Sequence, residues 1–322
     1  MKALVLGATG LIGFHITMAL RRRGLRPRAL VRDAQRGRVL HGDGVDLVVG
    51  DVTDPTSLQG VFNDVDVVFH AAGIPEQWVP DEGVFERVNH QGCRHVAQAA
   101  AAAGVRRLVF LSTIDVFEPE HDQRIHEQCA RRTQARSAYE RSKQAADLHL
   151  QTQYPPSGPL EIVYLHPCAI YGPGPTTSRG TNDFVKEIKA RQIPILIPGG
   201  MPLVLAADVG EAAVRAAERA QPGERLVLAG PWISLKDLAQ QVHQHLAYGR
   251  VPPVLPLAVA RAVSTLTQAW SRLAGGAPLV PRGQLEALQW GAKPDARRAR
   301  EQLEMTFTGL DTGLRQLLDS LH

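Results

Sequence analysis

The chain has little cysteine, no large excess of charge of either sign and no long hydrophobic run. Its three cysteines, Cys93, Cys129 and Cys168, are an odd number without CxxC spacing. This excludes a disulfide framework and favours a reducing compartment, so we expect a cytoplasmic protein. The apolar run after Lys2 stops at Gly7, which is too short for a signal peptide. The longest uncharged stretch of the C-terminal half, 193–207, is broken by prolines and glycines, so we expect no integral membrane segment.

The charge balance excludes some classes of partner. The 322 residues carry 36 basic and 32 acidic side chains, a formal net charge of +4. The basic cluster at 21–23 suits the C-terminal end of a predicted helix, where cations complement the helix dipole. No nucleic-acid partner is therefore expected. None of the twelve histidines forms an HExxH motif, so we expect no metal site.

Short apolar runs alternate with helical patterns through the first half of the chain. The runs are apolar on both faces, as strands of a buried parallel sheet are. We expect strands at 3–6, 28–31, 46–49, 65–70, 107–112, 161–165 and 225–228. The alternation predicts an α/β fold, a doubly wound parallel sheet with helices on both faces.

A glycine-rich turn follows the first predicted strand directly. Gly7, Gly10 and Gly13 have G-x-x-G-x-x-G spacing, and a helical pattern begins inside the motif. Such a turn lets backbone approach a pyrophosphate, and the helix N-terminus supplies N–H donors. The motif predicts a dinucleotide site that also includes Thr9 and the Leu11–Ile12 pair.

The end of the second predicted strand bears on cofactor choice. Arg32 would accommodate a 2′-phosphate, which favours NADP(H), whereas the adjacent Asp33 would suit NAD(H) and keeps that alternative open. After the third strand, Asp51 and Val52 are candidates for the adenine end, although Asp51 is equally suited to a turn.

Two further strand ends and one helix supply candidate chemistry. Small residues, Ala71, Ala72 and Gly73, follow the fourth strand and permit close approach of a ligand. Thr113 follows the fifth and could orient a reacting oxygen. Tyr139 and Lys143 stand four residues apart in a helical stretch and share a face. A nearby ammonium favours the phenolate, so Tyr139 could serve as general acid and base.

In this order, the motifs resemble those of extended short-chain dehydrogenases/reductases, the NAD-dependent epimerase/dehydratase group. The matching segments are GATGLIG, VRD, GDVTD, FHAAG, RVNHQGC, LST, YERSK and HPCAIYGPG, which span residues 1–174, with 203–229 continuing the pattern. The resemblance implies a Rossmann-type domain made of 1–171 and 203–229. It also implies a smaller, mixed α/β substrate lobe made of 172–202 and 230–322.

The resemblance also implies roles for individual residues. Thr113 would bind the reacting oxygen, Tyr139 would exchange its proton, and Lys143 would hold the nicotinamide ribose. Asn89 would fix a helix kink and a proton-relay water. Pro167, Ala169 and Ile170 would line the nicotinamide pocket. The helices at 89–103 and 139–153 often pair two copies in this group, which is compatible with a homodimer.

Within the group, the chain is most similar to dihydroflavonol reductase and 3β-hydroxysteroid dehydrogenase-like reductases. Nucleotide-sugar epimerases usually carry an arginine in the segment matching 200–209, and this chain has none there. We therefore expect an NADP(H)-dependent oxidoreductase that interconverts a ketone and a secondary alcohol on a mainly apolar substrate. The alternatives are a sugar epimerase or dehydratase and a non-catalytic NADP(H)-binding sensor. A further departure is His166, where the group often has arginine before proline.

The stretch 251–290 is rich in Leu and Val and contains Trp270 and Trp290. It has two interpretations that the sequence does not separate, the lining of an apolar substrate pocket and the core of the smaller lobe.

Overall fold

The computed structural model describes residues 1–75, 79–129, 135, 137–175, 180–247, 249–274 and 282–321, without the side chains of 269, 271–274 and 282. Among these residues, no helix is both long and apolar enough to cross a bilayer.

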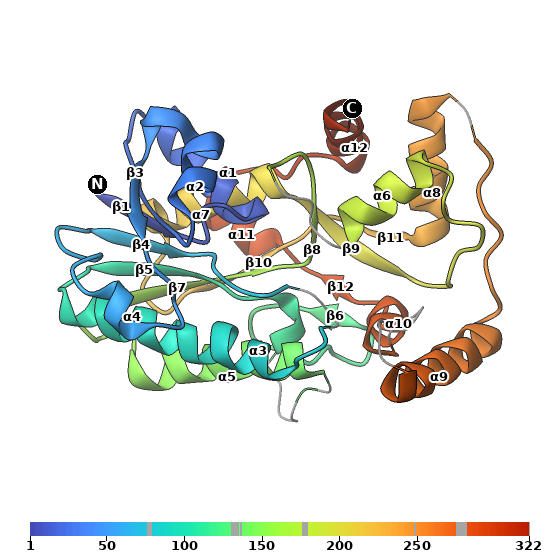
Figure 1. Ribbon diagram of the computed structural model, residues 1–322, viewed down its shortest axis with the longest axis horizontal. Coiled ribbons are helices and arrows are strands. Elements are labelled where there is room, and N and C mark those ends of the chain that lie inside the picture. Colours follow the sequence, from blue (N-terminus) through green and yellow to red (C-terminus); the bar gives the residue numbers. More distant parts are fainter. Residues whose placement is uncertain are drawn as a thin grey trace.

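A seven-stranded parallel sheet dominates the fold (Figure 1). Its strand order is β10-β7-β5-β4-β1-β2-β3. The strands are β1 (Ala3–Leu6), β2 (Arg28–Val31), β3 (Asp46–Val49), β4 (Val67–His70), β5 (Arg107–Leu111), β7 (Glu161–Pro167) and β10 (Arg225–Leu228). The chain starts inside the sheet with β1, continues to the edge strand β3 and then crosses to the other side, where it ends with the edge strand β10. Because all neighbouring strands are parallel, their carboxyl ends lie at the same end of the sheet.

Helices cover both faces of this sheet. In the view of Figure 1, α4 (Gly92–Ala102) and α5 (Ala138–Gln153) lie below it, and α1 (Leu11–Arg22), α2 (Ala34–His41) and α7 (Ala206–Arg219) lie above it. Shorter helical turns are η1 (Gly42–Gly44), η2 (Pro55–Leu58), α3 (Gly83–Phe85), the π-helix η3 (Glu86–Gln91) and η4 (Ile114–Val116). The expected fold class, a parallel α/β sheet with a small mixed sheet beside it, is confirmed.

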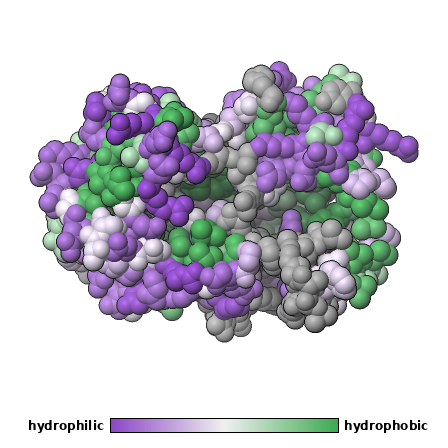
Figure 2. Space-filling view, in the orientation of Figure 1, coloured by the Kyte–Doolittle hydropathy of each residue, from purple (hydrophilic) through white to green (hydrophobic). Residues whose placement is uncertain are grey.

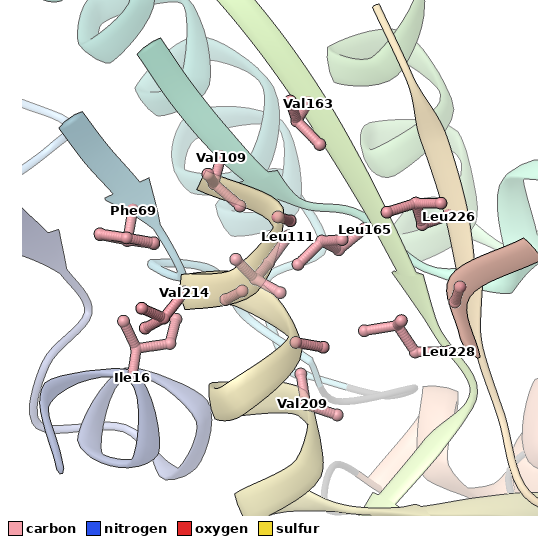
Figure 3. Packing of buried hydrophobic residues seen from close by; sticks show 14 of the residues in the cluster. Ile16, Phe69, Val109, Leu111, Val163, Leu165, Val209, Val214, Leu226 and Leu228 are labelled. Carbon is pink, nitrogen blue, oxygen red and sulfur yellow. The ribbon is translucent and has the colours of Figure 1, made fainter. Parts of the chain in front are cut away.

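The two faces of the sheet form two separate cores because side chains alternate along each strand. On β5, Val109 and Leu111 join the core under α1 and α7, which Figure 3 shows, whereas Leu108 and Phe110 join the core under α4 and α5. The strands are apolar on both faces for this reason, which is why the sequence shows continuous apolar runs.

A smaller part of the structure is built on a three-stranded mixed sheet, β11-β9-β8. Its elements are β8 (Ala169–Tyr171), α6 (Thr181–Lys189), β9 (Gly200–Leu205), β11 (Trp232–Ser234), α8 (Leu235–Leu246), α9 (Leu257–Ala274), α10 (Arg282–Gln289) and α12 (Leu310–Ser320). It has its own apolar core. A two-stranded sheet pairs β6 (Arg124–Ile125) with β12 (Lys293–Pro294), and α11 (Arg297–Gln302) packs on β10 of the large sheet.

Four predicted strands, β1, β2, β3 and β10, have the predicted bounds, and the other three differ by no more than two residues at one end. Pro55 begins the four-residue 3₁₀ helix η2, and the Asp54 carboxylate caps it by accepting a hydrogen bond from the Thr56 N–H. Ser234 caps α8 by accepting a hydrogen bond from the Asp237 N–H. The division of the chain into a nucleotide domain and a substrate lobe stays a proposal.

Leu108→Ala should lower the free energy of unfolding by about 2–5 kcal/mol, because it leaves a cavity between β5 and the helices below. Chemical denaturation followed by circular dichroism measures this. Val49→Ala is the matched control, because Val49 is also on a strand but is 59% exposed, and it should change stability by less than about 0.5 kcal/mol. Equal effects for the two variants would contradict this packing.

Candidate active site

The glycine-rich turn lies where β1 meets α1, and two of its glycines are required by space. Gly7 has φ +78°, and a Cβ on it would lie 2.7 Å from the backbone of Ala71 and Ala72. A Cβ on Gly13 would lie 2.1 Å from the Gly7 carbonyl oxygen. Gly10 is the N-cap residue of α1, and no side chain in the described part of the protein caps that end. The turn thus leaves backbone N–H groups and a positive helix end available to an anion, as a pyrophosphate requires.

The turn after β1 and the loop after β3 lie at the same carboxyl end of the sheet. Thr9 and Ile12 are partly buried, and Leu11 is buried as the first residue of α1. Asp51 Oδ1 accepts hydrogen bonds from the Thr53 N–H and hydroxyl, so this carboxylate closes a turn. The adenine role expected for Asp51 and Val52 stays a prediction.

Arg32 and Asp33, the two charged residues that follow β2, have different surroundings. Asp33 caps α2, because its Oδ1 accepts hydrogen bonds from the N–H groups of Gln35 and Arg36 at 2.8 and 3.1 Å. Arg32 is exposed beside it, as is Arg36 in the first turn of the helix. The acidic side chain that would suit a ribose hydroxyl is therefore already held by backbone, while the two cations face solvent at a helix N-terminus.

Asn89 lies in a π-helix. The helix η3 spans Glu86–Gln91 and leads directly into α4. The Asn89 side chain accepts from the Ile74 N–H at 2.7 Å and donates to the Ile74 carbonyl and to Ser142 Oγ at 3.2 and 3.0 Å. It therefore connects the loop after β4 to helix α5. π-Bulges of this kind are frequent at functional sites. The water relay expected for Asn89 stays a prediction.

Helix α5 presents three ionisable side chains at i, i+4 and i+8 on its buried face. Tyr139, Lys143 and Asp147 are 8%, 8% and 3% exposed. The Ser137 hydroxyl caps the helix by accepting from the Glu140 N–H, so Tyr139 lies in its first turn. Lys143 Nζ donates to the Leu111 carbonyl oxygen at 2.7 Å, at the carboxyl end of β5. Tyr139 and Lys143 therefore lie at the carboxyl end of the sheet, the same end at which the glycine turn follows β1.

Burial lowers the pKa of Lys143 to about 8, against the opposing influence of nearby acids, among them Asp147. Burial, and to a smaller extent the charge of Lys143, lowers the pKa of His70 to about 3, so this imidazole is neutral. Lys143 is therefore an ammonium at neutral pH that titrates within reach of ordinary buffers.

Thr113 caps the turn η4, and its hydroxyl hydrogen is engaged. Thr113 Oγ1 donates to Asp115 Oδ2 at 2.7 Å and accepts from the Asp115 N–H at 3.3 Å. A hydroxyl has one hydrogen and two lone pairs, so the remaining capacity of Oγ1 is that of an acceptor. Asp115 was not predicted as a site residue. Its place two residues after Thr113 is the signal that could have identified it.

His166, which stands where the group often has arginine, lies beside the guanidinium of Arg225. Arg225, on the neighbouring strand β10, donates from Nε to His166 Nε2 at 3.3 Å and from Nη2 to Asp147 at 2.9 Å. Because Nε2 accepts, His166 carries its hydrogen on Nδ1, which donates to the Thr113 carbonyl at 3.2 Å. Burial and Arg225 hold the pKa of His166 well below its usual value, so the ring is neutral.

Arg225 and Asp147 were missed by sequence reasoning. Asp147 stands one turn after Lys143, which is a readable signal, whereas Arg225 lies in a strand that only the sheet order brings next to β7. Pro167 ends β7 and is buried, and Ala169 and Ile170 in β8 are partly buried. Among the described residues, no three His, Cys, Asp or Glu side chains come together as metal ligands.

The fold, and the glycine-rich turn at the carboxyl end of its parallel sheet, define a dinucleotide-binding α/β protein with a buried Tyr–Lys pair. The profile of the NAD dependent epimerase/dehydratase family matches residues 3–229, and the chain belongs to this family, whose enzymes are NAD(P)-dependent.

Relatives match nearly the whole chain at low identity. Sterol demethylase protein B of Methylococcus capsulatus is 24% identical, over 96% of this chain and 94% of its own. A Synechocystis protein provisionally named a dihydroflavonol 4-reductase is 25% identical, over 99% and 93%. The crystal structure of gox2253 superposes with a TM-score of 0.85 and 25% identity, over 99% of this chain and 97% of that one.

Gly13→Ala should weaken NADPH binding by about tenfold or more, because the new methyl group displaces the Gly7 carbonyl and deforms the turn. NADPH fluorescence titration measures this. Gly283→Ala is the control, since Gly283 is also in a helix and has open space around its Cβ position. Unchanged affinity in Gly13→Ala would show that the cofactor does not use this turn.

The buried Lys143 should also make stability depend on pH. Its pKa is lowered from 10.5 to about 8 in the folded protein, so the unfolded chain binds more protons between these values. The free energy of unfolding of the wild type, relative to Lys143→Met, should therefore rise by about 2–3 kcal/mol from neutral pH to about pH 10. Denaturant titrations at several pH values measure the difference, and a difference that does not vary with pH would contradict the burial of the ammonium.

Proposed function

We propose that the chain is an NADP(H)-dependent oxidoreductase that interconverts a ketone and a secondary alcohol on a mainly apolar substrate. The observation that carries the proposal is the buried face of α5, where Tyr139 stands one turn from Lys143 and Lys143 is bound to the end of β5. A non-catalytic sensor would have no use for a buried acid–base pair beside a cofactor turn. The two full-length relatives named above are a sterol demethylase protein and a provisional reductase, which supports an apolar substrate.

Tyr139, Lys143 and Thr113 have different roles at the reacting oxygen. When bound, the nicotinamide would supply or accept the hydride. The Tyr139 hydroxyl donates its proton to the ketone oxygen in reduction and accepts it in oxidation, and the nearby Lys143 ammonium favours the phenolate. Thr113 Oγ1 donates to Asp115 in the structure without substrate, and its hydrogen would turn to the substrate oxygen when the ketone binds, because the single hydrogen of the alcohol is the one exchanged with Tyr139. Pro167, Ala169 and Ile170 would bound the nicotinamide pocket.

Preference for NADP(H) is supported by the two strand-end charges. The Asp33 carboxylate is occupied as the cap of α2, whereas Arg32 and Arg36 are exposed at the same helix end. A 2′-phosphate there would meet two guanidinium groups and a positive helix end. NAD(H) would need the Asp33 carboxylate, which would have to leave its backbone partners.

A dehydratase or epimerase of the same family is the second candidate. The Asp115 carboxylate beside Thr113 favours it, since an acid at this place could take a proton from a carbon next to a carbonyl. Net cofactor conversion separates the two, because an epimerase returns its hydride and a reductase does not. The β9 segment 200–205 contains no arginine for a diphosphate, which supports the reductase.

The proposal includes a cytoplasmic location and a homodimer. The three cysteines are all buried and unpaired, which is in keeping with a reducing, cytoplasmic location. Leu148 on the outer face of α5 is 63% exposed, which would suit a homodimer that pairs α4 and α5 with their copies.

Tyr139→Phe should lower turnover of a ketone by about one-hundredfold to ten-thousandfold and leave NADPH affinity unchanged, because only the proton donor is removed. Absorbance of the nicotinamide follows turnover, and fluorescence titration follows binding. Tyr154→Phe, near the end of the same helix, is the control for loss of a phenol as such. Turnover retained in Tyr139→Phe would overturn the mechanism.

A further inference from the structure

Helix α5 buries two opposite charges one turn apart. Lys143 and Asp147 are 8% and 3% exposed, and their i, i+4 spacing places them next to each other on the helix. Charged side chains usually stay at the surface, and hydrophilic residues cover much of the face shown in Figure 2. Two further charges are buried among the described residues, Arg107 and Glu224, and each pairs with a side chain that reaches solvent. A buried charge is costly unless it has a partner, so the surroundings of Lys143 and Asp147 decide what this pair does.

The surroundings of Lys143 contain no negative charge in direct contact. Within the described part of the chain, its ammonium donates only to the Leu111 carbonyl oxygen and forms no ion pair. The Phe110 ring, whose centre is 5.3 Å from Nζ, is neutral. Burial also keeps the His70 ring and the Cys93 thiol neutral, because it lowers the pKa of the first to about 3 and raises that of the second to about 12. The ammonium therefore depends on carboxylates that are further away but are poorly screened by water.

Asp147 and Asp115 are the two carboxylates that act on Lys143. Burial lowers the pKa of Lys143 to about 8. The acidic groups that oppose this effect are Cys93, Asp147 and Asp115, in order of decreasing influence. The Cys93 thiol is uncharged at neutral pH, and Asp115 is only partly buried, with one of its oxygens bound by the Thr113 hydroxyl. Asp147 is therefore the main counter-charge of the ammonium.

Asp147 depends on Arg225 for its charge. Burial raises the pKa of Asp147, and the charge of Arg225 opposes this rise. Arg225 Nη2 lies 2.9 Å from Asp147 Oδ2, which also accepts from Gln151 Nε2 at 2.8 Å. The other oxygen, Oδ1, is buried and has no hydrogen-bond partner among the described residues. Tyr164 and His166, the titratable groups of β7 beside this ion pair, are both neutral, because burial raises the pKa of the phenol and lowers that of the imidazole.

The register of the sheet places Arg225 beside α5. Arg225 lies opposite Tyr164 in the ladder between β10 and β7, and Tyr164 belongs to the core under α4 and α5. Side chains opposite each other share a face of the sheet, so Arg225 points toward the helix that carries Asp147. The group often has an arginine at the position of His166, which is on β7. In this chain the edge strand β10 supplies the cation instead.

We propose that the ion pair between Arg225 and Asp147 keeps Lys143 charged at neutral pH, which makes Asp147 a positioning residue for the proton exchange at Tyr139. Arg225 keeps the carboxylate ionised, the carboxylate keeps Lys143 an ammonium, and the ammonium favours the Tyr139 phenolate. Only the last step rests on the proposed function, since the charge of Lys143 can be measured without turnover.

The titration of Lys143 tests the first two steps in the purified full-length protein. The chain has six lysines, so NMR of protein with isotope-labelled lysine gives few signals, and Lys143→Met assigns the one of Lys143. Its midpoint should lie near pH 8 in the wild type. In Asp147→Asn and in Arg225→Met it should fall by about one to two pH units, because the first variant lacks the carboxylate and the second lets it take up a proton. Asp147→Glu keeps the charge and should restore the midpoint to within about half a unit.

A double variant and a control separate this effect from general loss of a buried charge. Arg225→Met/Asp147→Asn should shift the midpoint no further than Asp147→Asn alone, because the two residues act as one pair. Arg107→Met is the matched control, since Arg107 is a second arginine of the large sheet, is 7% exposed and pairs with Glu161 at the amino end of β5. This variant should leave the midpoint unchanged. NADPH binding at pH 6 confirms that each variant is folded.

An unchanged midpoint in folded Asp147→Asn or Arg225→Met would overturn the inference, as would an equal shift in Arg107→Met. Oxidation of an alcohol tests the last step. Asp147→Asn should lower turnover at pH 8 by about tenfold or more, because a neutral Lys143 no longer favours the phenolate, and should lower it less at pH 6, where the lysine is charged again. Equal losses at both pH values would assign Asp147 a merely structural role. The expected midpoints in a wild-type protein that oxidises no alcohol would support the ion pair's effect on Lys143 and overturn the proposed function instead.

Discussion

The burial of the Lys143 ammonium against the end of β5 is the contact on which the arrangement of the candidate site depends. A charged nitrogen without water needs partners, and the Leu111 carbonyl supplies one at a fixed place. The residues on either side of Lys143 hold helix α5 in the same way. Ser142 receives a hydrogen bond from Asn89 of the π-helix, and Asp147 receives one from Arg225 of β10. These three polar contacts leave α5 little freedom to slide along the sheet, and Tyr139 is fixed with it.

The same network reaches the residue that would bind the substrate oxygen. Arg225 fixes the tautomer of His166, and His166 holds the Thr113 carbonyl, so the loop after β5 is tied to two neighbouring strands. The guanidinium also stacks 4.5 Å from the centre of the Phe117 ring. An arginine before Pro167, as the group often has, would bring its charge from β7. Here β10 brings it, and a neutral imidazole fills the remaining space.

Much of the fold was predictable because each buried strand is apolar on both faces and short, so its bounds coincide with the apolar run. The glycine turn, Thr113, Tyr139 and Lys143 were predictable because their spacing is local. Arg225 and the hydrogen bond from Thr113 to Asp115 were not, since the first depends on strand order and the second on a side-chain rotamer. Trp270 and Trp290 show the same limit. Trp290 packs against the core between the large sheet and helices α1 and α7, while Trp270 is exposed, and composition alone cannot predict this difference.

The most direct test of the account is the absorbance of NADPH and NADH, in parallel, during incubation of the wild-type protein with apolar ketones that include steroids and flavanones. The account predicts net oxidation of the cofactor in step with formation of the alcohol, faster with NADPH than with NADH. Tight binding of NADPH without net oxidation by any ketone would contradict it. In that case a reaction that returns the hydride, on a sugar or another alcohol, would be the better description of this site.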